Sequence, residues 1–222
     1  MRIDGLIVRY GDVTALDIDG LVLERGTSYA VIGANGCGKS TLARCIAGVL
    51  EPTAGAVALE ADDRVRYMPQ RSYAFYGSTR ANVLLGADAA SGAMGRAEEL
   101  MDALDLTALA QQKAKRLSGG QTARMALART LVGPGTWLLL DEPTAALDGE
   151  SMLKAERLVQ EYRESFDAGV VYITHSLKQA ARVSDMLVFM EGGRIVEMGR
   201  TRQLLDRPRT PSLARFLELF GS

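Results

Sequence analysis

The chain has 222 residues, of which 47% are hydrophobic and 24% are charged, and its formal net charge is −1. These values are typical of a compact globular protein with one large domain, and the balanced charge argues against DNA or RNA as a partner, because nucleic-acid binders usually carry a basic excess. No apolar run approaches the length of about 18 residues that a membrane-spanning helix needs, so we do not expect the chain to cross a membrane.

The N-terminal residues and the cysteines indicate the cellular compartment of the protein. Residues 1–10 alternate apolar and polar side chains and lack the basic start, apolar centre and small-residue cleavage site of a signal peptide. The two cysteines, Cys37 and Cys45, fit neither a disulfide framework nor a zinc site. We therefore expect a cytoplasmic protein without a disulfide or a zinc ion.

The first predicted elements are strands. Residues 3–10 and 14–23 have the composition of strands that flank a turn at Gly11 and Asp12, and residues 55–68 contain two more strand candidates. We expect these four strands to form an antiparallel lobe.

Short apolar runs follow at residues 28–32, 136–140, 169–173 and 185–190, with segments of helical periodicity between them. Because their apolar residues are consecutive, these strands are expected to be covered on both faces, as in a parallel sheet layered with helices. After a hairpin turn at residues 191–193, one strand and two short helices complete the chain. The predicted fold class is α/β, with a mostly parallel sheet beside the antiparallel lobe.

Residues 78–113 have a helical pattern that no strand-like run interrupts. They predict a helical subdomain inserted into the α/β core. Residues 88–95 are rich in Ala, Ser and Gly, and they are the expected flexible loop of that subdomain.

A glycine-rich segment joins the strand at residues 28–32 to a helix predicted over residues 41–49. It reads Gly-Ala-Asn-Gly-Cys-Gly-Lys-Ser and matches GxxxxGK[ST] in the strand-to-helix setting that this pattern requires. Inward-facing N–H groups and the helix N-terminus favour phosphate, Lys39 can reach the outer phosphates, and the Ser40 hydroxyl can ligate Mg²⁺. We therefore predict that a nucleoside triphosphate with Mg²⁺ binds to Gly33, Asn35, Gly36, Cys37, Gly38, Lys39, Ser40 and Thr41.

Two acidic residues end the apolar strand at residues 136–140. We assign Asp141 to Mg²⁺ and Glu142 to the water that attacks the terminal phosphate in line. Such a pair at a strand end is often only solvated, so the assignment depends on its combination with the phosphate loop.

The sequence Leu-Ser-Gly-Gly-Gln at residues 117–121 is identified as the signature of ATP-binding cassette (ABC) ATPases, and the resemblance extends over nearly the whole chain. Ser118 would begin a helix whose free N–H groups attract an anion. The resemblance implies that Ser118, Gly119, Gly120 and Gln121 bind the γ-phosphate held by a second cassette, so that hydrolysis needs a homodimer or heterodimer. It also implies a single P-loop NTPase domain, with a nucleotide-binding core at residues 1–77 and 114–222 and the helical subdomain at residues 78–113.

Other positions match the family in chain order. Tyr10 resembles the aromatic residue that stacks on adenine, and Gln70 resembles the glutamine that contacts Mg²⁺ and the attacking water. His175, the only histidine, resembles the switch histidine that contacts the γ-phosphate. Ala146 departs from the serine of many members and is assigned no function.

The resemblance implies an ATPase that drives a transporter through separate permease subunits, at the inner face of the cell membrane. Import is favoured over export, because Gln-Lys-Ala-Lys-Arg at residues 112–116 stands where many exporters have an acidic-glycine motif. The pattern looks closest to tungstate-type oxyanion importers and then to amino-acid importers, for which a solute-binding protein would be a further partner.

Alternatives to an importer stay open. The cassette could belong to an exporter, to a soluble ATPase that acts on a scaffold such as one for iron-sulfur assembly, or to a nucleic-acid or ribosome ATPase, although the last group usually fuses two cassettes in one chain. The aromatic residues Tyr73, Phe75 and Tyr76 either line a groove for the membrane subunit or belong to the core.

Cys37 lies inside the phosphate loop, next to Lys39 and a helix N-terminus, an arrangement that favours thiolate. We expect a maleimide to modify Cys37 faster than Cys45, and ATP with Mg²⁺ to protect it. The alternative is a sulfur turned into the protein.

Overall fold

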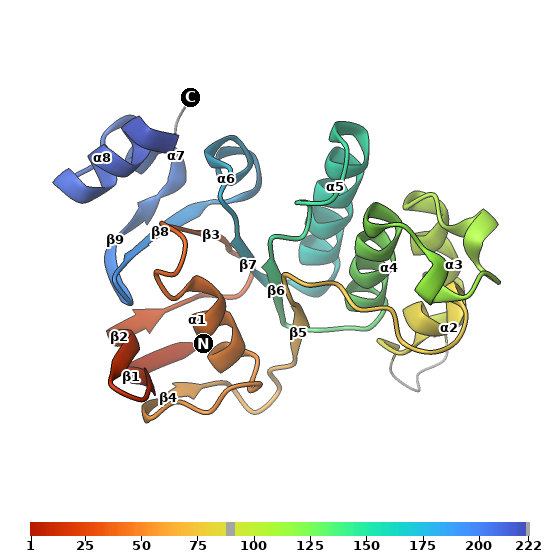
Figure 1. Ribbon diagram of the computed structural model, residues 1–222, viewed down its shortest axis with the longest axis horizontal. Helices are drawn as coiled ribbons and strands as arrows, with labels where there is room; N and C mark the ends of the chain where they lie inside the picture. Colours follow the sequence, from red (N-terminus) through yellow and green to blue (C-terminus); the bar gives the residue numbers. More distant parts are fainter. Residues whose placement is uncertain (88–91, 221–222) are drawn as a thin grey trace.

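The computed structural model describes residues 1–87 and 92–220, and it is built around two sheets (Figure 1). A six-stranded sheet has the order β5-β6-β7-β3-β8-β9. Its strands are β5 (Val65–Met68), β6 (Trp137–Asp141), β7 (Gly169–Ile173), β3 (Ser28–Ile32), β8 (Met186–Glu191) and β9 (Arg194–Arg200). Neighbouring strands are parallel except for β9, which pairs antiparallel with β8. The predicted α/β fold with a mostly parallel sheet is confirmed.

The central strands of this sheet are buried on both faces, as their continuous apolar runs predict. Every residue of β3, β6 and β7 is buried. Along β6, Trp137 and Leu139 belong to one hydrophobic cluster, whereas Leu138 and Leu140 belong to another. Because successive side chains of a strand point to opposite faces, the two clusters form separate apolar layers above and below the sheet.

The smaller sheet is antiparallel and has the order β2-β1-β4, with β1 (Arg2–Tyr10), β2 (Val13–Val22) and β4 (Ala54–Ala58). Its apolar face, including Ile3, Leu6 and Leu16, packs in the same cluster as Trp137 and Leu139. The predicted antiparallel lobe is therefore present, but with three strands.

The fourth strand expected in that lobe, β5, lies elsewhere, and the sequence prediction is wrong on this point. Residues Val65–Met68 pair in parallel with Trp137–Leu140 at the edge of the large sheet. The anchor is Asp63, whose Oδ1 accepts hydrogen bonds from Thr136 Oγ1 at 2.8 Å and Trp137 Nε1 at 3.0 Å. These bonds span more than seventy positions of the chain, so no local pattern predicts them.

Helices cover both faces of the large sheet. They are α1 (Lys39–Ile46), α2 (Thr79–Leu84), α3 (Ala93–Ala103), α4 (Gly119–Leu131), α5 (Gly149–Phe166), α6 (Leu177–Val183), α7 (Thr201–Asp206) and α8 (Pro211–Phe220), with 3₁₀ turns η1 (Thr107–Leu109) and η2 (Ala114–Arg116). The helix α1 packs between the two sheets, whereas α2 and α3 pack on α4 at the opposite end of the molecule from the small sheet (Figure 1). Within the described residues, no helix combines the length and apolar character that crossing a membrane requires.

The loop expected at residues 88–95 coincides with the structure only in part. Residues 88–91 lie outside the described residues, and Ala93 already begins α3. The C-terminal prediction is confirmed, because a turn through Gly192 and Gly193 joins β8 to β9 and the two short helices α7 and α8 follow.

Candidate functional site

The glycine-rich loop connects the end of β3 to the start of α1, as predicted, although α1 begins at Lys39 rather than at residue 41. Gly38 has φ +104° and is the N-cap of α1. A Cβ atom at this position would lie 2.7 Å from Leu16 Cδ2 and 2.8 Å from the Ala15 carbonyl oxygen, so a side chain would clash with β2. Glycine therefore lets the loop lie directly against the small sheet.

Lys39 is almost fully buried, and its ammonium group crosses the inside of the loop. Its Nζ donates hydrogen bonds to the carbonyl oxygens of Gly33 at 2.8 Å and Ala34 at 2.9 Å. The positive charge is thus fixed beside the backbone N–H groups that begin α1, where it can attract phosphate oxygens.

A cavity of about 360 Å³ opens in front of this loop. It lies at the carboxyl ends of β3, β5, β6 and β7, which is where open α/β sheets bind their ligands. The residues that line it are Ala15, Asn35, Gly36, Gly38, Lys39, Ser40, Thr41, Gln70, Asp141, Glu142, Ile173 and His175. The structure therefore brings the loop together with Gln70, both acidic residues and the histidine, as the sequence predicts.

Two carboxylate oxygens in this cavity are orphaned. Asp141 Oδ1 and Glu142 Oε1 are buried and have no hydrogen-bond partner within the described residues. Burial raises the pKa of Asp141, although a hydrogen bond from the Ser40 side chain opposes the shift. A cation beside these oxygens would compensate the burial of their charge, so the donor set of Ser40, Gln70 and Asp141 fits Mg²⁺.

Glu142 differs from Asp141 in its backbone and in its proton affinity. Its φ of +51° is left-handed, a strained conformation for a residue other than glycine. Burial and the neighbouring Asp141 charge raise its pKa to about 7. A carboxylate whose pKa is near neutrality can accept a proton from water, which is what a general base requires.

His175 follows β7 at the rim of the cavity. Its Nε2 lies 3.2 Å from Glu142 Oε1 but is not aligned for a hydrogen bond. Burial, reinforced by the charge of Lys39, lowers the pKa of His175, so the imidazole is neutral at neutral pH. A neutral ring can donate one hydrogen bond to a phosphate oxygen.

Other predicted site residues lie outside this cavity. Tyr10 ends β1 and is 51% exposed, whereas Gly33 lies beneath the loop. The signature residues begin α4, where the Ser118 hydroxyl accepts a hydrogen bond from the Gln121 N–H and the Gln121 side chain accepts one from the Ser118 N–H. This capping box stands apart from the cavity, so a single chain does not bring the signature residues, which are Ser118, Gly119, Gly120 and Gln121, to the phosphate loop.

The expectation of an open, reactive thiol at Cys37 is wrong. The side chain is 6% exposed and packs in the apolar cluster below the loop, because the loop turns the sulfur toward Gly33 and away from the cavity. Cys45 is buried as well, and burial raises its pKa. The Cys37 sulfur lies 3.9 Å from Lys39 Nζ, and Cys37 does not line the cavity, so a direct role in phosphate binding would fall to its backbone.

Ala15 is a cavity residue that sequence reasoning missed. It lies in β2, and its carbonyl oxygen faces both Gly38 and Gly193. The packing of β2 against the phosphate loop depends on long-range contacts, and the sequence around residue 15 carries no signal for it.

Comparison with known proteins assigns the family. A family profile described as ABC transporter matches residues 16–145. The chain is 34% identical to the aliphatic sulfonates import ATP-binding protein SsuB of Burkholderia ambifaria, over 99% of this chain and 69% of the relative. The chain belongs to the ABC transporter family. This ABC protein is also 34% identical to the sulfate/thiosulfate import ATP-binding protein CysA of Bordetella pertussis, over 98% of this chain, and spans 66% of that relative's length.

A third relative is the spermidine/putrescine import ATP-binding protein PotA of Thermobifida fusca, 35% identical over 94% of the ABC chain and 59% of the relative. Solved structures include an ATP-binding subunit of an ABC transporter, with a TM-score of 0.85 and 23% identity over 100% of this chain and 99% of that one, which supports the fold. A dimeric ATP-binding cassette in a post-hydrolysis state, bound to ADP and Pi, has a TM-score of 0.79 and 25% identity over 90% of this chain and 98% of that one. The ABC chain is therefore an ATPase that binds ATP with Mg²⁺.

Proposed function

We propose that this ABC ATPase hydrolyses ATP as a pair of cassettes, each of which completes the other's site. The observation that carries the proposal is the separation of the signature at Ser118–Gln121 from the cavity that holds Lys39 and Glu142. The capping box occupies the N–H groups of Ser118 and Gln121 but not those of Gly119 and Gly120, which, with the positive end of α4, offer the chemistry that a γ-phosphate needs. The dimeric state of a solved relative supports the same arrangement.

Within each composite site, different residues of the chain bind the phosphates, the adenine ring and Mg²⁺. Lys39 and the N–H groups of the phosphate loop hold the phosphates, and Tyr10 offers an aromatic face to adenine. Ser40, Gln70 and Asp141 hold Mg²⁺, which neutralises charge on the phosphate oxygens when bound.

Three side chains then act on the attacking water and the γ-phosphate. Glu142 takes the water proton, Gln70 orients the water, and His175 donates a hydrogen bond to the γ-phosphate. Support for these roles comes from the shared cavity and from the raised pKa of Glu142.

Mixing two inactive variants tests the composite site. Lys39→Ala disables the cavity, and Ser118→Arg disables the signature. A heterodimer of the two retains one cavity and one signature that face each other, so we expect ATPase activity to return on mixing. Lys39→Ala mixed with Glu142→Gln is the matched control, because both changes fall in the cavity and no complete site can form. Equal activity in the two mixtures would contradict the dimer.

We further propose that separate membrane permease subunits bind the cassette through an exposed aromatic patch, defined as Tyr73, Phe75 and Tyr76. All three are at least half exposed, Tyr76 to 91%, so the alternative that they belong to the core is wrong. Arg129 lies 4.9 Å from the centre of the Phe75 ring, and Lys115 lies 5.9 Å from that of Tyr76. A patch of rings flanked by cations fits a helix with an apolar face and an acidic or carbonyl-rich end.

The patch also supports the proposed division of the chain into a core at residues 1–77 and 114–222 and a helical subdomain at residues 78–113. It lies where the chain passes from β5 to α2, between these two parts. A permease helix docked there would contact both parts, and the cassette would then lie at the cytoplasmic face of the membrane.

Import of a small oxyanion is the direction and solute class that we propose. Three similar curated proteins are named for import, and two of them for sulfonates and for sulfate or thiosulfate. A solute-binding protein would be a further partner. Affinity purification of the tagged chain from membranes tests the proposal, with a permease as the expected partner. Recovery of an exporter subunit, an iron-sulfur scaffold or RNA in its place would contradict it.

A further inference from the structure

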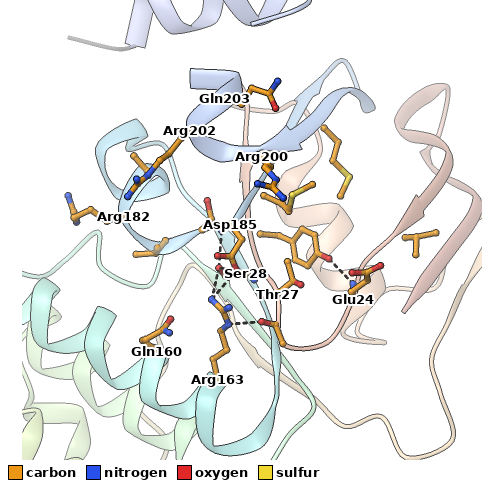
Figure 2. Close-up of a pocket in the computed structure, with 18 residues that line it drawn as sticks. Glu24, Thr27, Ser28, Gln160, Arg163, Arg182, Asp185, Arg200, Arg202 and Gln203 are labelled. Atoms are coloured by element: carbon orange, nitrogen blue, oxygen red, sulfur yellow. Dashed lines mark hydrogen bonds and ion pairs between the residues drawn. The ribbon is translucent and has the colours of Figure 1, made fainter. Parts of the chain in front are cut away.

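A second, larger cavity lies at the amino ends of the central strands β3 and β8, outside the proposed ATP site. It measures about 1,210 Å³ and opens where β3 begins, between α5, α6 and the junction of β9 with α7 (Figure 2). The phosphate loop follows the opposite end of β3, so the two cavities are about 16 Å apart along the strand. We name this cavity the basal groove.

One wall of the basal groove presents a fixed cation. Arg163 donates from Nε to the Gly26 carbonyl oxygen at 2.8 Å and from Nη1 to the Ser28 hydroxyl at 3.0 Å, and it pairs with Asp185 at 3.0 Å. These contacts hold the guanidinium in place as it points into the groove (Figure 2). Its second terminal nitrogen makes no hydrogen bond within the described residues.

The opposite wall carries two more arginines, Arg200 at the end of β9 and Arg202 in α7 (Figure 2). Both are exposed, and neither side chain forms an ion pair or a hydrogen bond within the described residues. Arg182, which also lines the groove, is already paired with Glu156 at 2.8 Å. Glu24 also lines the groove and has no ion pair among the described residues, so Arg200 and Arg202 together leave a smaller excess of positive charge that the described residues do not neutralise.

The size of the basal groove decides which kind of anion fits. Its volume exceeds the range of about 300 to 1,000 Å³ that is usual for small-molecule pockets. A neighbouring cavity of about 540 Å³ continues it along α5, because Gln160, Arg182 and Val183 line both, and its far end exposes Leu153. The basal groove and this neighbouring cavity together form a long surface depression with several arginines and an apolar end. Such a shape fits an extended peptide segment better than a compact ion.

We propose that the basal groove binds an acidic peptide segment of a partner protein. Carboxylates of the segment would form paired N–H···O bonds with Arg200 and Arg202, because guanidinium groups recognise carboxylates in this forked geometry. Arg163 would supply a third contact from the facing wall.

Fluorescence anisotropy with a labelled oligoglutamate peptide tests this proposal on the full chain. We expect binding that an oligoglutamine peptide of the same length does not show. The double variant Arg200→Gln with Arg202→Gln should weaken the affinity by about tenfold or more. The matched control is Arg207→Gln with Arg209→Gln, which removes the same charge from exposed positions just outside the groove and should bind as the wild type does.

Three outcomes would overturn the proposal: no binding of oligoglutamate, an equal loss of affinity in both double variants, or displacement of the peptide by inorganic phosphate at similar concentration. The second outcome would indicate non-specific attraction, and the third a site for small anions. Thermal unfolding of each variant checks that the fold is kept.

A separate observation concerns Gln179 in α6, a residue that is 2% exposed and whose side-chain amide makes three hydrogen bonds. Its Oε1 accepts a hydrogen bond from Thr174 Oγ1 at 2.7 Å, and its Nε2 donates to Thr144 Oγ1 and to Glu156 Oε1, each at 2.9 Å. Gln179 does not line the ATP cavity, but it joins two loops that do.

The two joined loops carry the water-activating pair. Thr174 directly precedes His175, and Thr144 follows Glu142 by two positions. Because the backbone at Glu142 is strained, its conformation needs support from the surrounding structure. We infer that Gln179 is a positioning residue that sets the distance between Glu142 and His175. This inference rests on the proposed roles of those two residues.

Steady-state kinetics of matched variants test the inference. Thr144→Val removes the hydrogen bond between Thr144 and Gln179, and Gln179→Leu removes that bond together with those to Thr174 and Glu156, each change at similar side-chain volume. Each variant should lower kcat by about tenfold while KM for ATP stays the same. The two effects should not add in the double variant. Thr144→Ser keeps the hydroxyl and should keep kcat. Asp63→Asn, a buried polar change at the other end of β6, is the structural control and should lower stability without lowering kcat.

Changes in KM alone, additive losses, or a loss in Thr144→Ser equal to that in Thr144→Val would overturn the positioning role. If Glu142→Gln and His175→Ala keep full activity, the proposed function itself fails. If they lose activity and Gln179→Leu does not, only the positioning role fails.

Discussion

Two different kinds of buried carboxylate lie at the two ends of β6. At its beginning, Asp63 accepts hydrogen bonds from Thr136, Trp137 and Arg25. Burial alone would raise the pKa of Asp63, but hydrogen bonds from Thr136, the Glu60 backbone N–H and Arg25 outweigh it, so that the pKa is lowered. At its end, Asp141 and Glu142 have orphaned oxygens and raised pKa values. A carboxylate with both oxygens bonded stabilises the fold, whereas the unpartnered oxygen of Asp141 and that of Glu142 fit the proposed binding of a cation and the proposed proton transfer.

The largest effect that this comparison predicts is on turnover. Glu142→Gln keeps the size of the side chain and removes the proposed base, so ATP hydrolysis should fall by about 10² to 10⁴-fold. ATP binding should persist and trap a dimer, visible by size-exclusion chromatography with ATP. Turnover close to that of the wild type, or a monomer under these conditions, would argue against the role of Glu142.

Lys39→Ala should act on binding rather than on the chemical step. Loss of a charge-assisted phosphate contact weakens ATP affinity by about 10 to 100-fold. Titration with a fluorescent ATP analogue measures this change in affinity. Lys154→Ala removes a lysine that is paired with Asp105 and Glu150 outside the cavity, and it should leave affinity unchanged. Equal affinity in both variants would exclude Lys39 from the site.

Asp63→Asn tests the partnered end of β6. It weakens several hydrogen bonds to a buried carboxylate and should reduce the free energy of unfolding by about 2 kcal/mol. The lowered pKa means that this contribution is present above the unfolded pKa and is lost as the pH falls through the folded one. Urea unfolding followed by the emission of Trp137, the only tryptophan, measures both effects. An acid dependence that is unchanged in the variant would contradict the assignment.

The smallest predicted effect is that of Glu142 on stability, and its pH dependence is opposite to that of Asp63. Because the folded pKa of Glu142 is about 7, above its unfolded value, the metal-free protein should lose stability as the pH rises from about 4.5 to 7. Water access limits this loss to about 1 to 2 kcal/mol. Glu142→Gln should therefore match the wild type at pH 4.5 and exceed its stability at pH 8 in urea unfolding. A difference that is the same at both pH values would not come from titration.

The difference between local sequence signals and long-range contacts explains which parts of the structure the sequence could predict. The apolar runs of β3, β6 and β7 and the glycine-rich loop are local signals, because burial on both faces and phosphate binding each require particular residues at adjacent positions. The placement of β5 depends on the bonds of Asp63 to Thr136 and Trp137, and these partners are far away in the chain.

The direction of the Cys37 side chain also could not be predicted from the local sequence. Whether the Cys37 sulfur points into the cavity or into the core depends on the backbone angles of the loop and on how closely Gly33 approaches β8. The capping box at Ser118 is readable as a helix start, but its distance from the cavity follows from the packing of α4 on the other side of the sheet.

That capping box has a kinetic consequence. Because Ser118 and Gln121 already bond each other's backbone N–H groups, the first turn of α4 is ordered before a second cassette arrives. Association then needs no coupled folding of this segment, and two such surfaces can dock as rigid bodies at the rates usual for preformed protein interfaces, about 10⁵ to 10⁷ M⁻¹s⁻¹. The lifetime of the ATP-bound pair would accordingly be controlled by dissociation, and so by how long the γ-phosphate remains intact between the two chains.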